Sequence, residues 1–392
     1  MHKNKSISLH EPIFQGNELK YLRDCLDSTW VSTSGYFINK FEKEIKNYTK
    51  TKNAIFCING TSGLQISLLV AGVKRNDEVI VPTITFIAPV NAIRYNGAEP
   101  IFMDCDNFYN IDQNKTIEFL KNNTEFKKGY TVNNKTKKII KAIIIVHAFG
   151  NAADFDRLNL FCKKRNIKVI EDASESLGTF YNKKNKHTGT IGDLGVISFN
   201  GNKIITAGAG GMILTNSSRL NKKIRYLIKQ AKDDALNFIH NNVGYNYAQT
   251  NVNAAIGLAQ LENISDILIK KKELHNKYID KLRNNSEYNL VLTPKFSKNN
   301  YWLNLIRTTA KNKKYLIKKL LLRNIYVRPI WYPNHLQKMY KNNQSYKIQN
   351  ALKLYRETIC LPSSYHLKDK DFKRVIKVLS ENNTESINKK GK

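Results

Sequence analysis

Short runs of apolar and β-branched residues alternate with segments of helical periodicity over the first two thirds of the chain. Runs of this length, bounded by polar or glycine-containing segments, are typical of buried strands. They predict seven strands, at residues 54–58, 78–81, 100–104, 142–147, 168–171, 195–199 and 211–214. Apolar residues recur at helical spacing over residues 64–71 and 155–165, which predicts helices between the strands.

Strands that alternate with helices predict an α/β fold, in which helices cover both faces of a mostly parallel sheet. In such a sheet, ligands bind at the carboxyl ends of the strands. Gly60, His147, Asp172 and Lys203 all fall at or just beyond the end of a predicted strand. We therefore expect these four residues to surround one crevice.

A chain of 392 residues is too long for one ordinary core and predicts a large domain with a smaller one. The pattern suggests a large domain with an N-terminal segment at residues 1–255, a long connecting helix within 256–290, a smaller α+β domain at 291–381, and a disordered polar tail at 382–392. A lysine-rich insertion at residues 110–141 should contain a helix near residues 114–121. Its sequence does not indicate what it does.

The formal net charge of +32 raises the question of a nucleic-acid partner, because lysine and arginine neutralise phosphates. The excess lysines are spread along the whole chain rather than gathered into one stripe with aromatic residues. We therefore attribute most of the charge to solvated surfaces and expect no nucleic-acid partner. A basic cleft would still attract a diphosphate-bearing substrate.

Apolar runs stay shorter than the roughly 18 to 20 residues that a membrane span requires, and no signal-type apolar segment follows the polar first residues. The five cysteines are scattered, odd in number and mostly within apolar stretches. This favours buried, reduced thiols over a disulfide framework or a metal site. We expect a cytoplasmic protein with no bound metal and no membrane partner.

The segment Asn59-Gly60-Thr61-Ser62-Gly63-Leu64 follows a predicted strand and opens a predicted helix. Free backbone N–H groups at the start of a helix, together with two hydroxyls, can hold a phosphate. The same segment could equally be a helix cap without a ligand. It is neither a Walker loop nor a GxGxxG motif, which counts against ATP and NAD.

Two residues have the chemistry that pyridoxal phosphate (PLP) requires. Lys203 lies in a loop with few charges, between a predicted strand and the glycine-rich run 208–211, where desolvation would lower the pKa of its amine. Such an amine can form an imine with an aldehyde and later act as a general base. Asp172 ends a buried strand, and its carboxylate could keep a pyridine nitrogen protonated. A helix cap or a structural ion pair would explain Asp172 as well.

Six motifs narrow the choice: Asn59-Gly60-Thr61-Ser62, residues 81–88 (VPTITFIA), residues 146–150 (VHAFG), residues 171–178 (EDASESLG), Ser198-Phe199 with Lys203, and Gly244-Tyr245-Asn246-Tyr247. Together they resemble the DegT/DnrJ/EryC/StrS-type nucleotide-sugar aminotransferases, and the resemblance covers residues 7 to about 379. It implies the PLP-dependent transferase fold type I, PLP as the cofactor, and a homodimer with shared active sites.

The resemblance also implies a role for each matching residue. Lys203 matches the lysine that forms the Schiff base, Asp172 the partner of the pyridine nitrogen, and Glu175 a residue on the hydroxyl side of the ring. The remaining cofactor positions are the phosphate-binding Gly60, Thr61, Ser62 and Ser198, the ring-stacking Phe86, and Asn246, which is donated to the phosphate across the dimer.

Residues 28–35, 171–179 and 328–336 look like the subgroup that serves the legionaminic acid and bacillosamine pathways. That resemblance would place six residues in the sugar pocket, although aromatic and histidine side chains in such loops also pack in cores and rims. They are Trp30, Thr33, His147, Trp331, Tyr332 and His335. Ala248 departs from the family, which usually has arginine there, so a bidentate contact is missing and donor affinity or acceptor choice stays open.

The expected reaction is transfer of an amino group, from glutamate as in the family, to the 4-keto carbon of a nucleotide-linked 4-keto-6-deoxy sugar. The products would be amino sugars for surface glycans. Two alternatives stay open. One is a PLP enzyme of the same scaffold with dehydratase-like chemistry, whose relatives have histidine in place of Lys203. The other is a non-catalytic basic protein that binds nucleic acid or has a regulatory role and holds no PLP.

Overall fold

The computed structural model describes residues 6–381. All seven predicted strands are present, and their ends lie within two residues of the expected positions. They are β1 (Asn53–Cys57), β2 (Glu78–Pro82), β3 (Glu99–Met103), β6 (Ile140–Val146), β7 (Lys168–Asp172), β10 (Leu194–Ser198) and β11 (Gly211–Thr215).

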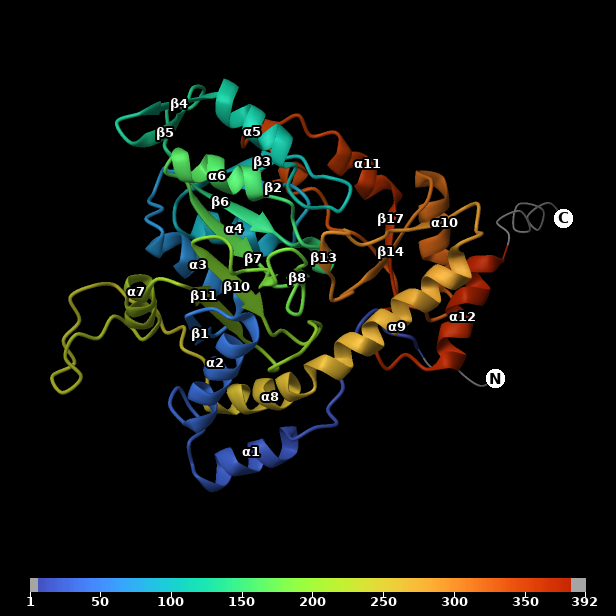
Figure 1. The fold of residues 1–392 in the computed structure, drawn as a ribbon, viewed down its shortest axis with the longest axis horizontal. Coiled ribbons are helices and arrows are strands. Elements are labelled where there is room, and N and C mark those ends of the chain that lie inside the picture. The colour runs from blue at the N-terminus through green and yellow to red at the C-terminus, as the bar shows by residue number, and fades with distance from the viewer. Residues whose placement is uncertain (1–5, 382–392) are drawn as a thin grey trace.

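These strands form one sheet in the order β1-β11-β10-β7-β6-β2-β3, which β16 (Ser345–Tyr346) extends at the β3 edge (Figure 1). Neighbours from β10 through β16 run parallel, whereas β11 runs antiparallel to both β10 and β1. The predicted mostly parallel sheet is therefore confirmed. All parallel strands end at the same edge, which is where this architecture places its ligands.

Both faces of the sheet are covered by helices, as the alternation in β6 shows. Ile143 and Ile145 belong to a core shared with α5 (Gln113–Asn122) and α6 (Asp156–Lys164). Ala142 and Ile144 point to the opposite face and belong to the core that contains α3 (Gly60–Val70) and α4 (Ile87–Tyr95). Since successive side chains of a strand face opposite sides, a continuous apolar run is what two covered faces require.

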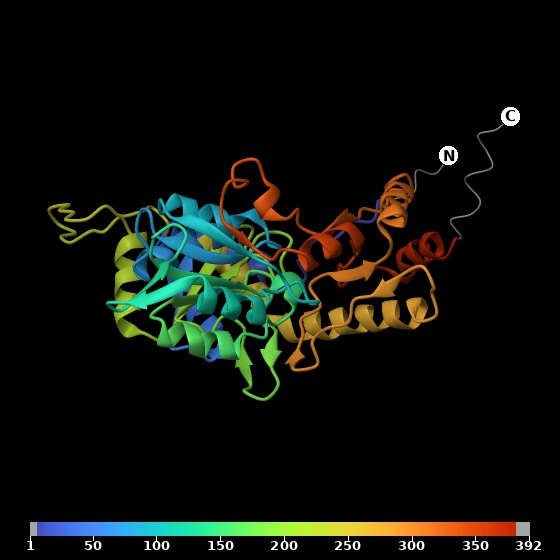
Figure 2. The same ribbon diagram turned by 90° about the horizontal axis from the view of Figure 1, so that it is seen from above.

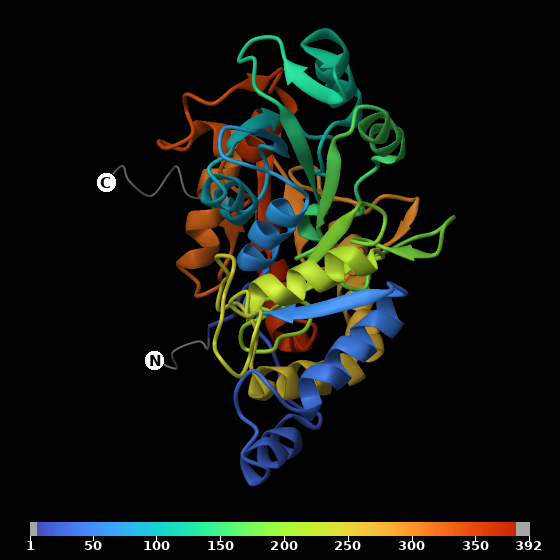
Figure 3. The same cartoon turned by 90° about the vertical axis from the view of Figure 1, so that its left-hand side faces the viewer.

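Other helices surround the β1 edge. There α7 (Ser218–Ile228) lies beside β1 (Figure 3), and α8 (Asn251–Glu262) packs with α1 (Glu18–Asp27) and α2 (Tyr36–Thr49). The segment 229–250, which joins α7 to α8, extends away from the rest of the molecule (Figure 2). It carries four exposed apolar side chains, Leu236, Phe238, Ile239 and Val243.

The long connecting helix expected within residues 256–290 is two helices, α8 and α9 (Ile264–Leu282). They meet at Asn263, whose backbone leaves the helical region with φ −99° and ψ 5°. Its side chain donates a hydrogen bond to the Ala259 carbonyl at 3.1 Å, which satisfies an acceptor at the end of α8. From this break, α9 runs out to the C-terminal part of the chain (Figure 1).

The C-terminal part has its own sheet and core. Its four strands are β12 (Asn289–Leu290), β14 (Asn304–Arg307), β17 (Thr358–Leu361) and β15 (Arg328–Pro329), in that order. The core gathers side chains from β12, β14 and β17, from α9, and from α10 (Ala310–Leu321) and α12 (Asp369–Ser380). Ile7, near the start of the described residues, joins this core and forms a parallel bridge with Ile325.

Smaller elements complete the fold: the hairpin of β4 (Thr124–Lys127) and β5 (Tyr130–Asn133), the strands β8 (Phe180–Tyr181), β9 (Lys186–His187) and β13 (Ser297–Lys298), and α11 (Asn350–Glu357). The insertion thus contains the predicted helix, as α5, with a hairpin after it. The expected tail at 382–392 lies outside the described residues. Within residues 6–381, no helix combines the length and the apolar character that a bilayer crossing demands.

Candidate active site

A cavity of about 260 Å³ opens where β1, β7 and β10 end. Among the residues that the sequence assigns to a cofactor, seven line it together: Gly60, Thr61, Phe86, Asp172, Glu175, Ser198 and Lys203. The C-terminal part of the chain contributes Trp302, Arg328 and Trp331 to the same cavity. The expected crevice therefore exists, with Lys203 and Asp172 both on its walls.

The start of α3 forms one part of the wall. Asn59 caps the helix by accepting a hydrogen bond from the Ser62 amide at 2.8 Å, and the amides of Gly60 and Thr61 have no partner within the helix. A Cβ on Gly60 would lie 3.2 Å from both Ser174 Oγ and Ser198 Cβ, so glycine keeps the approach to these amides open. This arrangement fits a phosphate group.

The Lys203 amine lies between an acid and an aromatic ring. Its Nζ is 3.8 Å from Glu175 Oε1 and 4.5 Å from the centre of the Trp302 ring. Burial lowers the pKa of Lys203, although Glu175 and Asp172 oppose the shift. Burial also raises the pKa of Glu175 to about 7, against the attraction of Lys203. A lowered amine pKa increases the share of neutral amine, which is the form that attacks an aldehyde.

Asp172 lies at the end of β7 with 6% of its surface exposed. Its Oδ1 accepts a hydrogen bond from the Ser174 amide at 3.0 Å. Burial nevertheless raises the pKa of Asp172, despite this bond and the charge of Lys203. A carboxylate in this position gains from a buried positive partner, and a protonated pyridine nitrogen would be one. Asp172, the amine of Lys203 and the cradle at α3 together fit PLP.

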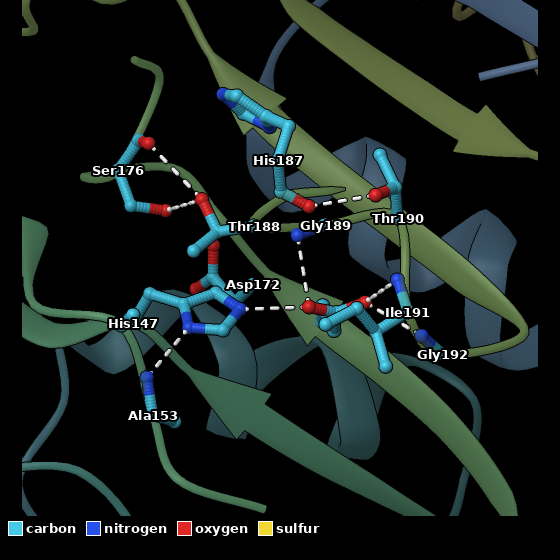
Figure 4. A network of polar contacts seen from close by, with 12 residues as sticks. His147, Ala153, Asp172, Ser176, His187, Thr188, Gly189, Thr190, Ile191 and Gly192 are labelled. Atoms are coloured by element: carbon cyan, nitrogen blue, oxygen red, sulfur yellow. Dashed lines mark hydrogen bonds and ion pairs between the residues drawn. The ribbon is translucent and has the colours of Figure 1, made fainter. Parts of the chain in front are cut away.

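Glu171 precedes Asp172 in β7, and its buried side chain is held by a hydrogen-bond network; Figure 4 labels its partners His147, Gly189, Ile191 and Gly192. Its carboxylate accepts from His147 Nε2 at 2.9 Å and from the amides of Gly189, Ile191 and Gly192 at 2.8, 2.6 and 2.6 Å. His147 Nδ1 accepts from the Ala153 amide at 3.1 Å, so Nε2 carries the proton. The network ties the ends of β6 and β7 to the loop before β10.

Burial alone would raise the pKa of Glu171, but the hydrogen bonds that its carboxylate accepts from His147 and from the backbone amides outweigh burial, and the pKa lies below its ordinary value. Replacing Glu171 by glutamine would put an amide where the site offers only donors. We expect Glu171→Gln to lower the free energy of unfolding by about 3 kcal/mol, measured by urea titration at pH 7.

Two controls sharpen this measurement. Glu125→Gln removes an exposed carboxylate and should leave the unfolding midpoint unchanged. The stability that ionised Glu171 contributes is present above the ordinary carboxyl pKa and is lost as the pH falls through the lowered one, so wild type and Glu171→Gln should converge in acid. Equal losses of unfolding free energy for Glu171→Gln and Glu125→Gln would show that the network adds no stability.

The structure places the other predicted site residues outside this cavity, with the exception of Trp331. His147 is buried in the Glu171 network, Ser62 holds Asn59 through its amide, and His335 Nδ1 lies 2.7 Å from Thr83 Oγ1. Three others are located as follows: Asn246 and Thr33 line a separate surface hollow, and Trp30 lines another. Tyr332 is 43% exposed.

Sequence reasoning assigned no role to Trp302 or Arg328, although both line the cavity. Arg328 stood at the start of the motif 328–336 and could have been singled out as its only cation. Trp302 belongs to none of the motifs, so nothing in the sequence singled it out in the same way. It follows a break in the local pattern and reaches the cavity through the packing of the C-terminal part against the large sheet, where its Nε1 donates to the Asn202 carbonyl at 2.7 Å.

A buried carboxylate, a lysine amine and an anion cradle around one cavity of an α/β fold define a PLP-dependent enzyme of the transferase type. Comparison with known proteins specifies the family. The model of the DegT/DnrJ/EryC1/StrS aminotransferase family matches residues 12–380. The chain belongs to this family. DegT-family aminotransferases use PLP, which is therefore the cofactor of this enzyme.

Three individual relatives illustrate the similarity. The GDP-perosamine synthase of Escherichia coli O157:H7 is 40% identical over 340 residues, which cover 86% of this chain and 87% of that protein. The GDP-perosamine synthase of Caulobacter vibrioides is 35% identical over 382 residues, or 96% and 98% of the two chains. The crystal structure of the aminotransferase TlmJ from Streptoalloteichus hindustanus has a TM-score of 0.87 at 24% identity, with 96% and 98% covered.

Proposed function

We propose that this aminotransferase moves an amino group from glutamate to the 4-keto carbon of a nucleotide-linked 4-keto-6-deoxy sugar. The observation that carries the proposal is the meeting of Lys203, Asp172 and the α3 cradle in one cavity. We place the reaction in the cytoplasm, because all five cysteines are free thiols.

When bound, PLP supplies an electrophilic carbon for amines and a ring that accepts the electron pair released at the substrate carbon. Asp172 supports that role by holding a positive charge at the ring nitrogen. The Nζ of Lys203 accepts the proton that leaves the α-carbon of the donor, and later returns a proton to the sugar carbon. Glu175, at 3.8 Å, keeps this amine oriented between transfers. Trp302 and Trp331 line the cavity, and their apolar rings would limit the entry of water.

The nucleotide is the part of the substrate on which relatives give information. Three relatives that cover most of this chain at 35% identity or more are named GDP-perosamine synthases. Their names support a GDP-linked sugar and an amino-sugar product of the perosamine kind. The expected place in legionaminic acid or bacillosamine biosynthesis gains no support from these names and stays a prediction.

A panel of nucleotide sugars tests the substrate. Purified enzyme with glutamate should aminate a GDP-linked 4-keto-6-deoxy sugar, identified by mass and NMR, faster than its UDP- or dTDP-linked counterparts or 3-keto isomers. Conversion of none of them would defeat the substrate proposal. Faster conversion of a UDP-linked sugar would instead favour the pathways expected from the sequence.

We also propose a homodimer with shared active sites. Asn246, the predicted contact to a phosphate, lies in a hollow separate from the cavity that holds Lys203. It belongs to the segment that carries the exposed Leu236, Phe238 and Val243, apolar side chains that a second subunit could cover. In this arrangement Asn246 of each protomer completes the active site of the other.

Mixed dimers test this sharing. Lys203→Ala and Asn246→Ala are each expected to be nearly inactive alone. Unfolded and refolded together in equal amounts, half of the dimers would be mixed, and each would contain one intact site. Activity should therefore recover to about a quarter of the wild-type value. If the refolded mixture is no more active than the two variants measured separately, while gel filtration shows dimers, each site belongs to a single chain.

A further inference from the structure

Arg328 stands out among the residues of the cavity that the reaction scheme does not use. It lies in β15 and lines the cavity, and its guanidinium lies over the Trp331 ring at 4.9 Å from the ring centre. Lys203 is the other cation on the cavity wall and already faces Glu175. Within residues 6–381, no carboxylate forms a salt bridge with Arg328.

Two hydrogen-bond donors of this wall are buried without an acceptor in the described part of the chain. They are Nε of Arg328 and Nε1 of Trp331. A buried donor without a partner is costly, and native structures keep few of them. Here both belong to residues that line one cavity, which indicates that a ligand supplies the acceptor.

The geometry of the donors indicates the kind of acceptor. A guanidinium presents a planar fork that matches two oxygens of one anion, and stacking on an indole ring fixes its plane. A carboxylate or a phosphate would satisfy this fork together with the indole N–H. A neutral hydroxyl would leave the charge of Arg328 uncompensated.

The position of Arg328 in the same cavity as Lys203 favours the carboxylate. In an amino acid, the carboxylate is one bond from the carbon that loses its proton, so both groups must fit within one small space. In a nucleotide sugar, the sugar ring separates the reacting carbon from the diphosphate. We propose that Arg328 and Trp331 bind the α-carboxylate of the amino donor. This inference rests on the proposed function, because it assumes an amino acid as the donor.

Binding of glutarate, a dicarboxylate without an amine, tests the site independently of turnover. Two of the three tryptophans line the cavity, so tryptophan emission can follow a titration of the PLP-loaded enzyme. Arg328→Gln should weaken glutarate binding by about 10- to 100-fold, because a charge-assisted pair is lost. Arg328→Lys should give an intermediate loss, and Trp331→Phe, which keeps a ring, a smaller one. Arg356→Gln removes an exposed arginine on α11 and should change nothing.

The two half-reactions then distinguish donor from acceptor. With glutamate, Arg328→Gln should need a 10- to 100-fold higher donor concentration for half-maximal conversion of the cofactor. With the amine form prepared in advance, the half-saturating concentration of sugar nucleotide should change less than about threefold. If the half-saturating concentration of sugar nucleotide rises instead and that of glutamate does not, the assignment is wrong and Arg328 binds the sugar nucleotide. If wild type binds glutarate but glutamate does not convert its cofactor, the proposed donor fails, and the glutarate series alone decides the role of Arg328.

Discussion

Lys203→Ala is expected to abolish amino transfer and to remove the imine absorbance of the purified enzyme. The Nζ of Lys203 is the amine that lines the cavity beside Asp172 and Glu175, and burial lowers its pKa. Its loss removes both the covalent attachment of the cofactor and the base that moves the proton. We expect the rate to fall by at least about 10⁴-fold.

The control for this variant uses another lysine of the same chain. Lys222→Ala removes an exposed lysine on α7 and should retain the absorbance and the activity. Because Lys203→Ala keeps the α3 cradle, added PLP should still bind, but dialysis should remove it. A Lys203→Ala enzyme that keeps the imine band would show that another amine holds the cofactor.

Asp172→Asn is expected to slow amino transfer by about 10²- to 10³-fold while the cofactor stays attached to Lys203. An amide cannot stabilise a positive charge at the ring nitrogen, so the ring becomes a weaker electron acceptor. Single-turnover conversion with glutamate, followed by absorbance, measures the effect directly. Asp280→Asn, on the exposed face of α9, is the matched control.

In the cofactor-free protein, Asp172→Asn should not lower the folding stability, although it slows the reaction of the loaded enzyme. Burial raises the pKa of Asp172, so its ionised form costs folding free energy at any pH above the ordinary carboxyl pKa. The neutral amide avoids this cost. Cofactor-free Asp172→Asn should therefore melt at the same or a higher temperature than wild type at pH 7. A large loss of stability together with the loss of rate would instead give Asp172 a structural role.

The sequence predicts the sheet well for a physical reason. Strands such as residues 140–146 are buried on both faces and therefore contain consecutive apolar residues, which local inspection can detect. The direction of β11 leaves no such trace, since an antiparallel strand between covered faces has the same composition. The two-residue strand β16 is too short for any pattern.

The break between α8 and α9 shows a different limit of prediction from the sequence. The apolar pattern continues through Asn263, and only the local hydrogen bond of its side chain to Ala259 and the packing of the two helices decide where the axis changes. Asparagine occurs both inside helices and at their ends, so its presence alone predicts neither outcome.

The sequence indicated which residues meet at the cavity where they directly follow a strand, but not where distant segments come together. Lys203, Asp172 and Gly60 each lie just after a predicted strand, which places them at one edge of the sheet. Arg328 reaches the same cavity from β15 of the other sheet and Trp302 from the segment just before β14, through tertiary packing that no local pattern records. His147 also ends a strand, yet the acceptor it needs is Glu171 in the sheet interior, so it is not among the cavity residues.

The most direct measurement is a crystal structure of the protein loaded with PLP. We predict continuous density from Lys203 Nζ to the cofactor, a carboxylate oxygen of Asp172 within hydrogen-bond distance of the ring nitrogen, and the phosphate on the amides that open α3. A cofactor attached to another residue, or a ring nitrogen with no contact to Asp172, would contradict the assignment of this cavity as the active site.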